Sequence, residues 1–446
     1  MMRVLAPEAL LDGTTVRFGW AVAYRDGWIE QVGPLEQLRA ALPGCVVLEA
    51  PQRLLMPGLV NAHSHSFQSL LRGLGDDRPF AAWRDVLYRF TPRLGPEDVY
   101  TAGLFAFGEM LRYGTTTVCD FFYLHHGDNE RAIALAQAAE DLGIRLVLAR
   151  SMMDWDVAPA AYRETPEQAV ANGRALASRF QGHSLVRVIP APHSPHGASG
   201  EMIQAGARLA AELDTPWHIH VAEAPYEGEQ IRRRYGCGPL EWIEQLGALD
   251  ERIRIVHGVW LEEQEIAALG RAGGGLIHCP GSNLFLGDGI APLRVYLQHG
   301  VTVTLGCDSG SANSRLSMFD EMRLAATLQK GLAGSGDALG AAEVLHMATA
   351  NGEHVTGLPL GRIAPGMLAD FCLIRLDDLS MQPRHRIAHN LVYSLHHGAV
   401  TDVYVHGEPV VREGHLVRVA EAAIVERARR LTESWMAELY RAESTV

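Results

Sequence analysis

The chain has 446 residues, 48% of them hydrophobic and 20% charged, and its formal net charge at pH 7 is −13. This length and hydrophobic content predict a globular protein with one large α/β domain and a smaller one. The negative charge argues against nucleic acid or an anionic membrane as a partner, and it suits a protein that binds a small-molecule substrate.

The N-terminal residues and the cysteines predict a cytoplasmic protein. The N-terminus, MMRVLAPEALLDG, lacks the long apolar core of a signal peptide, and no apolar run approaches the ~20 residues of a transmembrane helix. The six cysteines are scattered singly without a C-x-x-C pair, which argues against a zinc knuckle. Cys119, Cys279, Cys307 and Cys372 lie in apolar runs, as buried thiols of a reducing compartment do.

Short β-like runs occur at both ends of the chain. Neither set is large enough to bury a sheet alone, so we expect one small β-sandwich domain built from residues 1–56 plus 360–446. The early strands are expected at 16–22, 28–32 and 46–50, and the late strands at 369–374, 400–408 and 410–414. A helix over about 420–441 should pack on the body through Ala423, Val425, Ala428, Leu431, Trp435 and Leu439.

Residues 57–359 alternate strand-like and helical patterns, which predicts a (β/α)8 TIM-like barrel. A doubly wound open sheet is the alternative, but no Gly-rich dinucleotide turn follows any strand. Strands are expected at 59–61, 115–121, 145–150, 185–190, 217–221, 254–256, 275–278 and 301–305. Helices are expected at 96–113, 129–142, 167–180, 200–213 and 262–272, among others.

Polar residues gather where several of these strands end. Because catalytic residues of such barrels lie at the C-terminal ends of the strands, we expect these side chains to converge. They are His63, His65, His193, His196, His218, His220, Glu223, His257 and Asp308. His63 and His65 are two apart and point to the same side of a strand, although a His-x-His pair alone is a weak signal.

Three imidazoles and one carboxylate would suit zinc or iron, with one coordination position open for water. Glu223 would then move a proton from that water to a leaving nitrogen, and His257 would polarise the electrophile. A binuclear site often needs a carboxylated lysine as a bridge. The only lysine, Lys330, is not near any predicted barrel strand end, so we expect one metal ion per chain.

Several separated motifs resemble the amidohydrolase superfamily, specifically its cytosine-deaminase-like aminohydrolases. The motifs cover almost the whole chain and are specific as a set. They are residues 57–65 (PGLVNAHSH), 112–117 (RYGTTT), 220–223 (HVAE), 256–258 (VHG), 278–283 (HCPGSN), 306–308 (GCD) and 361–370 (GRIAPGMLAD).

The resemblance implies a ligand set and roles. It implies that zinc, or alternatively iron, is bound by His63, His65, His220 and Asp308. It implies that Glu223 is the proton shuttle, that His257 stabilises the developing tetrahedral centre and that Asp308 helps to activate the water as a hydroxide. His218 faces the same way as His220, but the family's ligand stands three residues before the glutamate, so we interpret His218 as a supporting residue. The resemblance also implies a homodimer or larger assembly.

Two branches of the superfamily compete for the substrate. Residues 282–292 and 313–325 resemble deaminases of methylthioadenosine and S-adenosylhomocysteine, whereas residues 65–68, 83–89 and 121–126 resemble N-formimino-glutamate deiminase. Neither match is complete. His196 stands where the deiminase would have an arginine for the α-carboxylate and the nucleoside deaminases a tyrosine. The latter would also have a ribose-binding glutamate where this chain has Phe90-Thr91-Pro92-Arg93.

We therefore expect hydrolytic deamination of an amino-substituted N-heterocycle of the purine, pterin or pyrimidine type, with a nucleoside included. The alternatives are a formimino or amidine deiminase, a chloro- or amidohydrolase, and a non-catalytic scaffold. The candidate substrate-binding residues are Gln68, Trp83, Arg84, Tyr123, His193 and His196. Core packing is an equal alternative for Trp83 and Tyr123, and a solvated surface charge is the alternative for Arg84.

Overall fold

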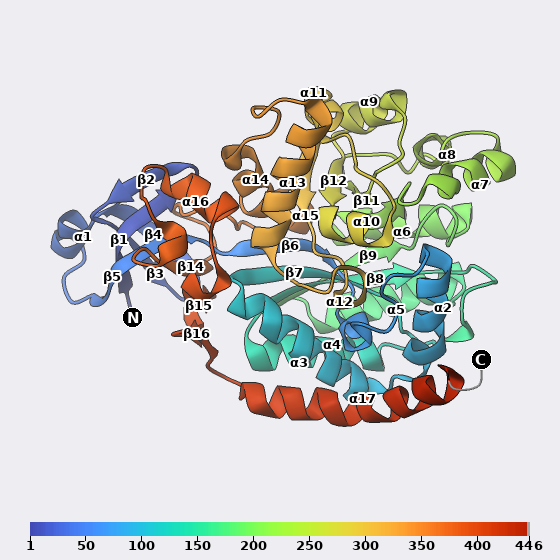
Figure 1. Cartoon of the computed structure of the whole chain (residues 1–446), viewed down its shortest axis with the longest axis horizontal. Coiled ribbons are helices and arrows are strands. Elements are labelled where there is room, and N and C mark those ends of the chain that lie inside the picture. The colour runs from blue at the N-terminus through green and yellow to red at the C-terminus, as the bar shows by residue number, and fades with distance from the viewer. Residues whose placement is uncertain (444–446) are drawn as a thin grey trace.

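Two four-stranded parallel sheets from the middle of the chain close on each other to form a barrel (Figure 1). In this computed structural model, which describes residues 1–443, strands of each sheet follow one another in chain order. Strand β9 contacts β10 and β13 contacts β6, which closes the ring. The strands are β6 (Leu59–Ser64), β7 (Thr115–Phe122), β8 (Arg145–Met152), β9 (Val186–Pro192), β10 (Trp217–Val221), β11 (Ile253–His257), β12 (Gly275–His278) and β13 (Thr302–Leu305).

The predicted helices cover the outside of this barrel, each within one residue of its expected bounds. They are α3 (Pro96–Arg112), α4 (Glu130–Leu142), α5 (Pro166–Arg179), α6 (Gly200–Leu213) and α9 (Glu263–Ala272). Local chemistry explains their starts. The hydroxyl of Thr165 accepts from the backbone N–H of Gln168, and the Gln168 side chain accepts from the backbone N–H of Thr165 in return. This reciprocal cap satisfies two N–H groups that the first turn of α5 would otherwise leave unpaired.

Several further helices were not assigned from the sequence, and some of them line the open end of the barrel. Helix α2 (Phe80–Phe90) follows the 3-10 turn η1 (Ser66–Leu71), and α10 (Pro280–Leu286) follows β12. The others are α7 (Pro225–Tyr235), α8 (Pro239–Gln245), α11 (Leu293–Gln298), α12 (Gly310–Asn313), α13 (Met318–Ala333), α14 (Ala341–Ala348), α15 (Gly352–Thr356) and α16 (Ile387–Tyr393), with α1 (Leu35–Ala41) in the N-terminal part.

A nine-stranded sheet combines the two ends of the chain, which lie side by side in Figure 1. Its order is β17-β16-β15-β14-β5-β1-β3-β4, with β2 paired to β1. The early strands are β1 (Arg3–Asp12), β2 (Thr15–Phe18), β3 (Trp20–Arg25), β4 (Trp28–Pro34) and β5 (Val46–Pro57). The late strands are β14 (Phe371–Arg375), β15 (Val400–Val405), β16 (Glu408–Arg412) and β17 (His415–Leu416).

Strand β5 joins the two halves of this sheet, because it pairs in parallel with β1 and antiparallel with β14. The sheet curls so that Tyr24 on β3 meets Phe371 on β14, with ring centroids 5.6 Å apart. All nine strands nevertheless belong to one sheet. The description of this part as a separate β-sandwich, and the division of the chain at residues 56–57 and 359–360, stay predictions.

The last helix, α17 (Glu421–Glu443), packs against α3, and Figure 1 shows it running along the outside of the barrel. Its buried face agrees with the predicted one at Ala428 and Trp435 and differs from it at residues 423–425. Ile424, Ala428 and Trp435 are buried, whereas Ala423 is exposed and Val425 is 60% exposed. The side chain of Leu439 lies outside the described part of the structure. Within residues 1–443, no helix is both long enough and apolar enough to cross a membrane.

Candidate metal centre and active site

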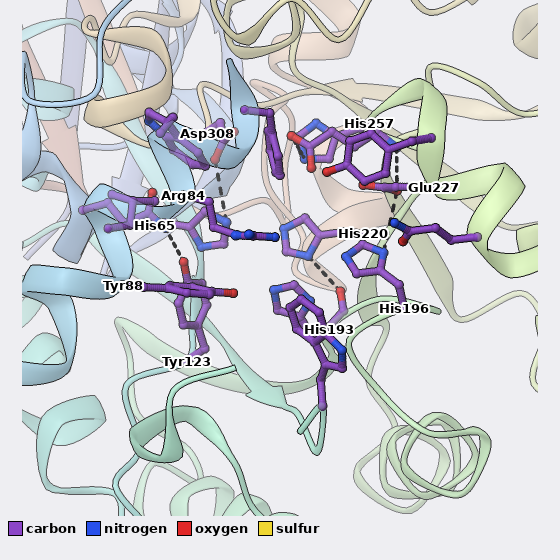
Figure 2. Close-up of a pocket in the computed structure, with 18 residues that line it drawn as sticks. His65, Arg84, Tyr88, Tyr123, His193, His196, His220, Glu227, His257 and Asp308 are labelled. Carbon is purple, nitrogen blue, oxygen red and sulfur yellow. Dashed lines mark hydrogen bonds and ion pairs between the residues drawn. The ribbon is translucent and has the colours of Figure 1, made fainter. Parts of the chain in front are cut away.

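The strand-end histidines and Asp308 converge at the open end of the barrel. The Nε2 atoms of His63 and His65 lie 3.6 and 3.7 Å from Oδ1 of Asp308. The candidate ligand atoms of His63, His65 and His220 all lie within 4.8 Å of one another, and so do those of His63, His257 and Asp308. Figure 2 shows His65, His220, His257 and Asp308 pointing toward one another. The structure thus brings together the four residues expected to bind a metal.

Backbone carbonyl groups orient two of these imidazoles. Nδ1 of His65 donates to the carbonyl oxygen of Phe121 at 2.5 Å, and Nδ1 of His220 donates to that of His193 at 2.8 Å. Both rings therefore present Nε2 to the cluster. Burial lowers the pKa of His65 to about 4 and that of His220 to about 3. Both stay neutral near pH 7, which is the form that binds metal ions.

His63 shows most directly that this cluster fits a cation. Its side chain is fully buried, and neither ring nitrogen has a hydrogen-bond partner among the described residues. An unpaired buried polar atom is costly unless a ligand satisfies it. Three imidazole nitrogens with one carboxylate oxygen form a donor set that zinc and iron accept. His218 is not among the residues whose ligand atoms gather in this cluster, and its Nε2 lies 3.3 Å from the carbonyl oxygen of Val355.

Unusual backbone conformations aim the site residues. Ala222, His257 and Asp308 have φ values of +53°, +72° and +58°, although none of them is glycine. Such left-handed conformations cost roughly 1–3 kcal/mol each and persist only where the surrounding structure holds them. Each occurs at or just after the end of a barrel strand. The strain turns the chain abruptly, so that side chains which leave different strands reach one centre.

Glu223 and His257 lie together beside the metal-binding cluster. Oε1 of Glu223 is 3.4 Å from Nε2 of His257. Burial raises the pKa of Glu223 well above its usual value, and the nearby carboxylates of Asp288, Glu227 and Asp308 add to the rise. Burial lowers the pKa of His257 well below its usual value. Burial therefore favours a protonated carboxyl group beside a neutral imidazole.

A cavity of about 140 Å³ opens onto Glu223, His257 and Asp308. All six residues predicted to bind substrate line it: Gln68, Trp83, Arg84, Tyr123, His193 and His196. The same wall includes seven residues that the sequence analysis did not select: Phe80, Leu87, Tyr88, Trp155, Tyr226, Glu227 and Gln230. Helical periodicity could have indicated Leu87 and Tyr88, which lie one turn after Trp83 and Arg84 on α2. No comparable signal marks Trp155 or Glu227.

Hydrogen bonds fix one wall of the cavity. Nε1 of Trp83 donates to the carbonyl oxygen of Ser311 at 3.0 Å. The Ser311 hydroxyl donates to Oε1 of Gln68 at 3.2 Å, and Nε2 of Gln68 donates to the hydroxyl of Tyr123. Helices α2 and α12, turn η1 and the residue that follows strand β7 are thereby linked around the opening. Trp83 and Tyr123 are therefore both packed in the core and exposed to the cavity, so the two interpretations offered for them are compatible.

The remaining predicted pocket residues bring basic groups to the cavity. The guanidinium of Arg84 pairs with Asp85 at 3.3 Å, and its central carbon lies 5.6 Å from the centroid of the Tyr88 ring. Nδ1 of His196 lies 3.9 Å from Oε2 of Glu227. Glu227 also accepts the backbone N–H of Glu223 at 3.1 Å. His196 is thus connected through Glu227 to the residue expected to move protons (Figure 2).

Comparison with curated proteins finds relatives that span nearly the whole chain. A 5-methylthioadenosine/S-adenosylhomocysteine deaminase from Pyrococcus furiosus is 34% identical, and the alignment covers 92% of this chain and 95% of the relative. A 5'-deoxyadenosine deaminase from Methanothermobacter thermautotrophicus is also 34% identical, with 98% of each chain covered.

Comparison with solved structures and family models agrees with the fold. An adenosine deaminase from Xanthomonas campestris with bound zinc has a TM-score of 0.90 and 31% identity, covering 96% of this chain and 97% of its own. An atrazine chlorohydrolase from Arthrobacter aurescens, complexed with zinc, has a TM-score of 0.89 and 25% identity, covering 96% and 99%. The model of the amidohydrolase family matches residues 54–410. This chain therefore belongs to the amidohydrolase family.

Proposed function

We propose that this protein is a metal-dependent deaminase that removes the exocyclic amino group of an adenine-type base and releases ammonia. The observation that carries the proposal is the placement of Glu223. Its buried carboxyl lies 3.4 Å from His257 beside a cluster of three histidines and Asp308, at the inner end of a cavity. The relatives named as deaminases of adenosine derivatives supply the substrate class.

The metal would be held by Nε2 of His63, His65 and His220 and by Oδ1 of Asp308. We propose one zinc ion per chain, with iron as the alternative, and the zinc in two similar structures supports this choice. When bound, the metal supplies a polarised water whose pKa falls from 15.7 toward about 7. No binuclear arrangement is proposed, because Lys330 is remote from the cluster and donates to the hydroxyl of Tyr393.

Proton transfer is assigned to Glu223. Its carboxyl group protonates the ring nitrogen next to the reacting carbon, takes a proton from the attacking water and delivers it to the amino group. A carbon–oxygen bond forms, the carbon–nitrogen bond breaks, and ammonia leaves, while the new hydroxyl returns its proton to Glu223 and becomes a carbonyl. His257 donates a hydrogen bond to the oxygen at the reacting carbon. The raised pKa of Glu223 suits this cycle, because the group must hold a proton before it can give one.

The side chains that line the cavity suit a substrate with an aromatic ring. Trp83, Tyr88 and Tyr123 offer ring faces, and Gln68 and Arg84 offer polar groups at the same wall. The N-formimino-glutamate type of deiminase lacks support at one position, because His196 replaces the arginine expected to bind the α-carboxylate. Hydrolysis of a carbon–chlorine bond is the alternative reaction, because the atrazine chlorohydrolase shares the fold.

The test is a turnover screen on protein loaded with one equivalent of zinc or iron, which measures ammonia from the amino and formimino compounds and chloride from the chlorotriazine. The panel contains adenine, adenosine, 5'-deoxyadenosine, methylthioadenosine, amino-pterins, cytosine, formimino-glutamate and a chlorotriazine. We expect ammonia from at least one adenine-type compound and none from metal-free protein. Turnover of only formimino-glutamate or the chlorotriazine would contradict the proposal. Absence of stoichiometric metal after purification and reconstitution would favour a scaffold.

We also propose that the protein works in the cytoplasm as a homodimer or larger assembly. The six cysteines are all unpaired in the structure, as expected in a reducing compartment. Sedimentation of the purified protein tests the assembly, and a mass equal to one chain at all concentrations would contradict it.

A further inference from the structure

Two adjacent residues of helix α10 contact two different groups of the proposed active site. The hydroxyl of Ser282 donates to Oδ2 of Asp308 at 2.5 Å. The side-chain nitrogen of Asn283 lies 3.1 Å from Nδ1 of His257. Both residues are fully buried, and neither was selected from the sequence as a site residue. One short turn therefore contacts a metal ligand and the neutral imidazole beside the proton shuttle.

The hydrogen bond from Ser282 determines which oxygen of Asp308 is free. Because Oδ2 accepts the hydroxyl, Oδ1 remains for the cluster, where it lies 3.6 and 3.7 Å from Nε2 of His63 and His65. Ser282 thus stabilises the orientation that a metal ligand requires.

The contact from Asn283 determines which nitrogen of His257 carries the proton. The amide nitrogen of Asn283 can only donate, so Nδ1 of neutral His257 must accept. The proton of His257 is then on Nε2, which faces Oε1 of Glu223 at 3.4 Å.

The rest of the molecule holds this turn of α10 in place. The backbone N–H of Gly281 donates to Oε2 of Glu321 at 2.9 Å, and Nδ2 of Asn313 donates to Oε1 of Glu321 at 2.7 Å. A β-carbon at residue 281 would lie 2.4 Å from Oδ1 of Asn313, so only glycine allows this close approach. Contacts with α12 and α13 that do not involve Ser282 or Asn283 therefore hold this turn in place.

We propose that Ser282 and Asn283 are the positioning residues of this site: Ser282 aims Oδ1 of Asp308 at the metal, and Asn283 holds His257 as the Nε2–H tautomer. The kinetic consequence rests on the proposed deaminase function. The metal affinity and the tautomer do not, because both are measured without a substrate.

The first experiment measures zinc affinity by competition with a chelator. Ser282→Ala should weaken binding about 10- to 100-fold, the usual effect of removing a group that orients a metal ligand. Ser282→Thr, which keeps a hydroxyl, should retain affinity close to that of the wild type. Thr356→Val is the matched control, because it deletes an equally buried hydroxyl that donates to Gly352 at 2.8 Å and accepts the backbone N–H of Leu358 at 3.1 Å, both outside the proposed active site. Wild-type zinc affinity in Ser282→Ala would overturn the role of Ser282.

The second experiment reads the tautomer of His257 from ¹⁵N chemical shifts of histidine-labelled, zinc-loaded protein. His257→Gln identifies the signals. Wild type should show a protonated Nε2, and Asn283→Asp, which offers an acceptor, should move the proton to Nδ1. Asn283→Ala should lower kcat at least 10-fold with little change in KM. A protonated Nδ1 in the wild type would overturn the role of Asn283. Failure to release ammonia from any adenine-type compound would overturn the proposed function, but not these two assignments.

Discussion

At the scale of single residues, burial favours opposite protonation states within a few ångströms. The same removal from water lowers the pKa of His65 and His220 and raises the pKa of Glu223, because it penalises whichever form is charged. Burial thus favours neutral histidines, which can bind a metal ion, and a glutamate that holds a proton. The same physical cause, removal from water, therefore prepares both the metal ligands and the acid.

Replacing Glu223 by glutamine should separate proton transfer from metal binding. Glutamine keeps the size of the side chain but cannot transfer a proton, so the rate should fall about 10²–10⁴-fold, the usual contribution of general acid–base catalysis. Metal content should stay equal to that of the wild type, because Glu223 is not among the expected ligands. Ammonia release and metal analysis of the same preparation check both statements. Near-wild-type turnover would show that another group moves the proton.

A second prediction concerns Glu321, whose pKa burial raises to about 8. Its unfolded pKa is near 4.5, so between those values the folded protein binds a proton that the unfolded chain does not. Stability should therefore fall as the pH rises through this window. Glu321→Gln should remove that loss, and the stability difference between about pH 5 and pH 8 should shrink by roughly 1–3 kcal/mol. Urea unfolding at both pH values measures it. Asp320→Asn is the control, since that side chain is partly exposed, and an equal effect there would contradict the assignment.

At the scale of elements, the sequence predicts regular units better than it predicts their ends. Helix α6 and strands β10 and β12 have the expected bounds, because their periodicity and flanking turn residues are clear. Strand β1 was missed because its apolar run is interrupted by Pro7 and Glu8, yet it lies in the middle of the nine-stranded sheet. Here tertiary pairing outweighs local propensity.

The candidate site shows the same limit at its own elements. The resemblance to the family's motifs selects His63, His65, His220 and Asp308, and the structure brings them together. It does not reveal the left-handed backbone at Ala222, because nothing about an alanine indicates a positive φ. It also cannot select Glu227, whose helix begins only after the motif ends. Ala222 and Glu227 contribute to the site because of the path of the backbone after β10, which a sequence motif does not show.

One buried ion pair joins strand β8 to the segment that precedes α5. Both guanidinium NH groups of Arg150 donate to the carboxylate of Glu164 at 2.8 Å, and both side chains are nearly fully buried. Glu164→Ala should cost about 3–5 kcal/mol, because it leaves a buried charge unpaired. Glu212→Ala breaks the pair with Arg174, in which both side chains are about half exposed, and should cost far less because water screens the pair. Urea denaturation compares them, and equal losses would contradict the argument.

At the scale of the whole molecule, the barrel and the sheet from the chain ends are joined by more than the covalent chain. Strand β5 leads from the sheet directly to β6, which carries His63. Arg145, the first residue of β8, donates to both carboxylate oxygens of Asp370 at 2.9 and 3.0 Å. Asp370 also accepts the backbone N–H of His406 at 2.7 Å. A strand of the barrel is thereby tied to the connections around β14 and β15.

Asp370→Ala should therefore weaken this junction. The two side chains of the pair are each only 3% exposed, so the variant leaves a buried guanidinium unpaired at a cost of about 3–5 kcal/mol. Hydrogen exchange should rise first in β14 and β15, while α6 on the far side of the barrel keeps its protection. Glu353→Ala is the control, because its pair with Arg362 is about half exposed and should contribute about 0–1 kcal/mol. Uniform acceleration of exchange across both parts would show that sheet and barrel unfold as one unit, and that this buried pair stabilises the molecule as a whole.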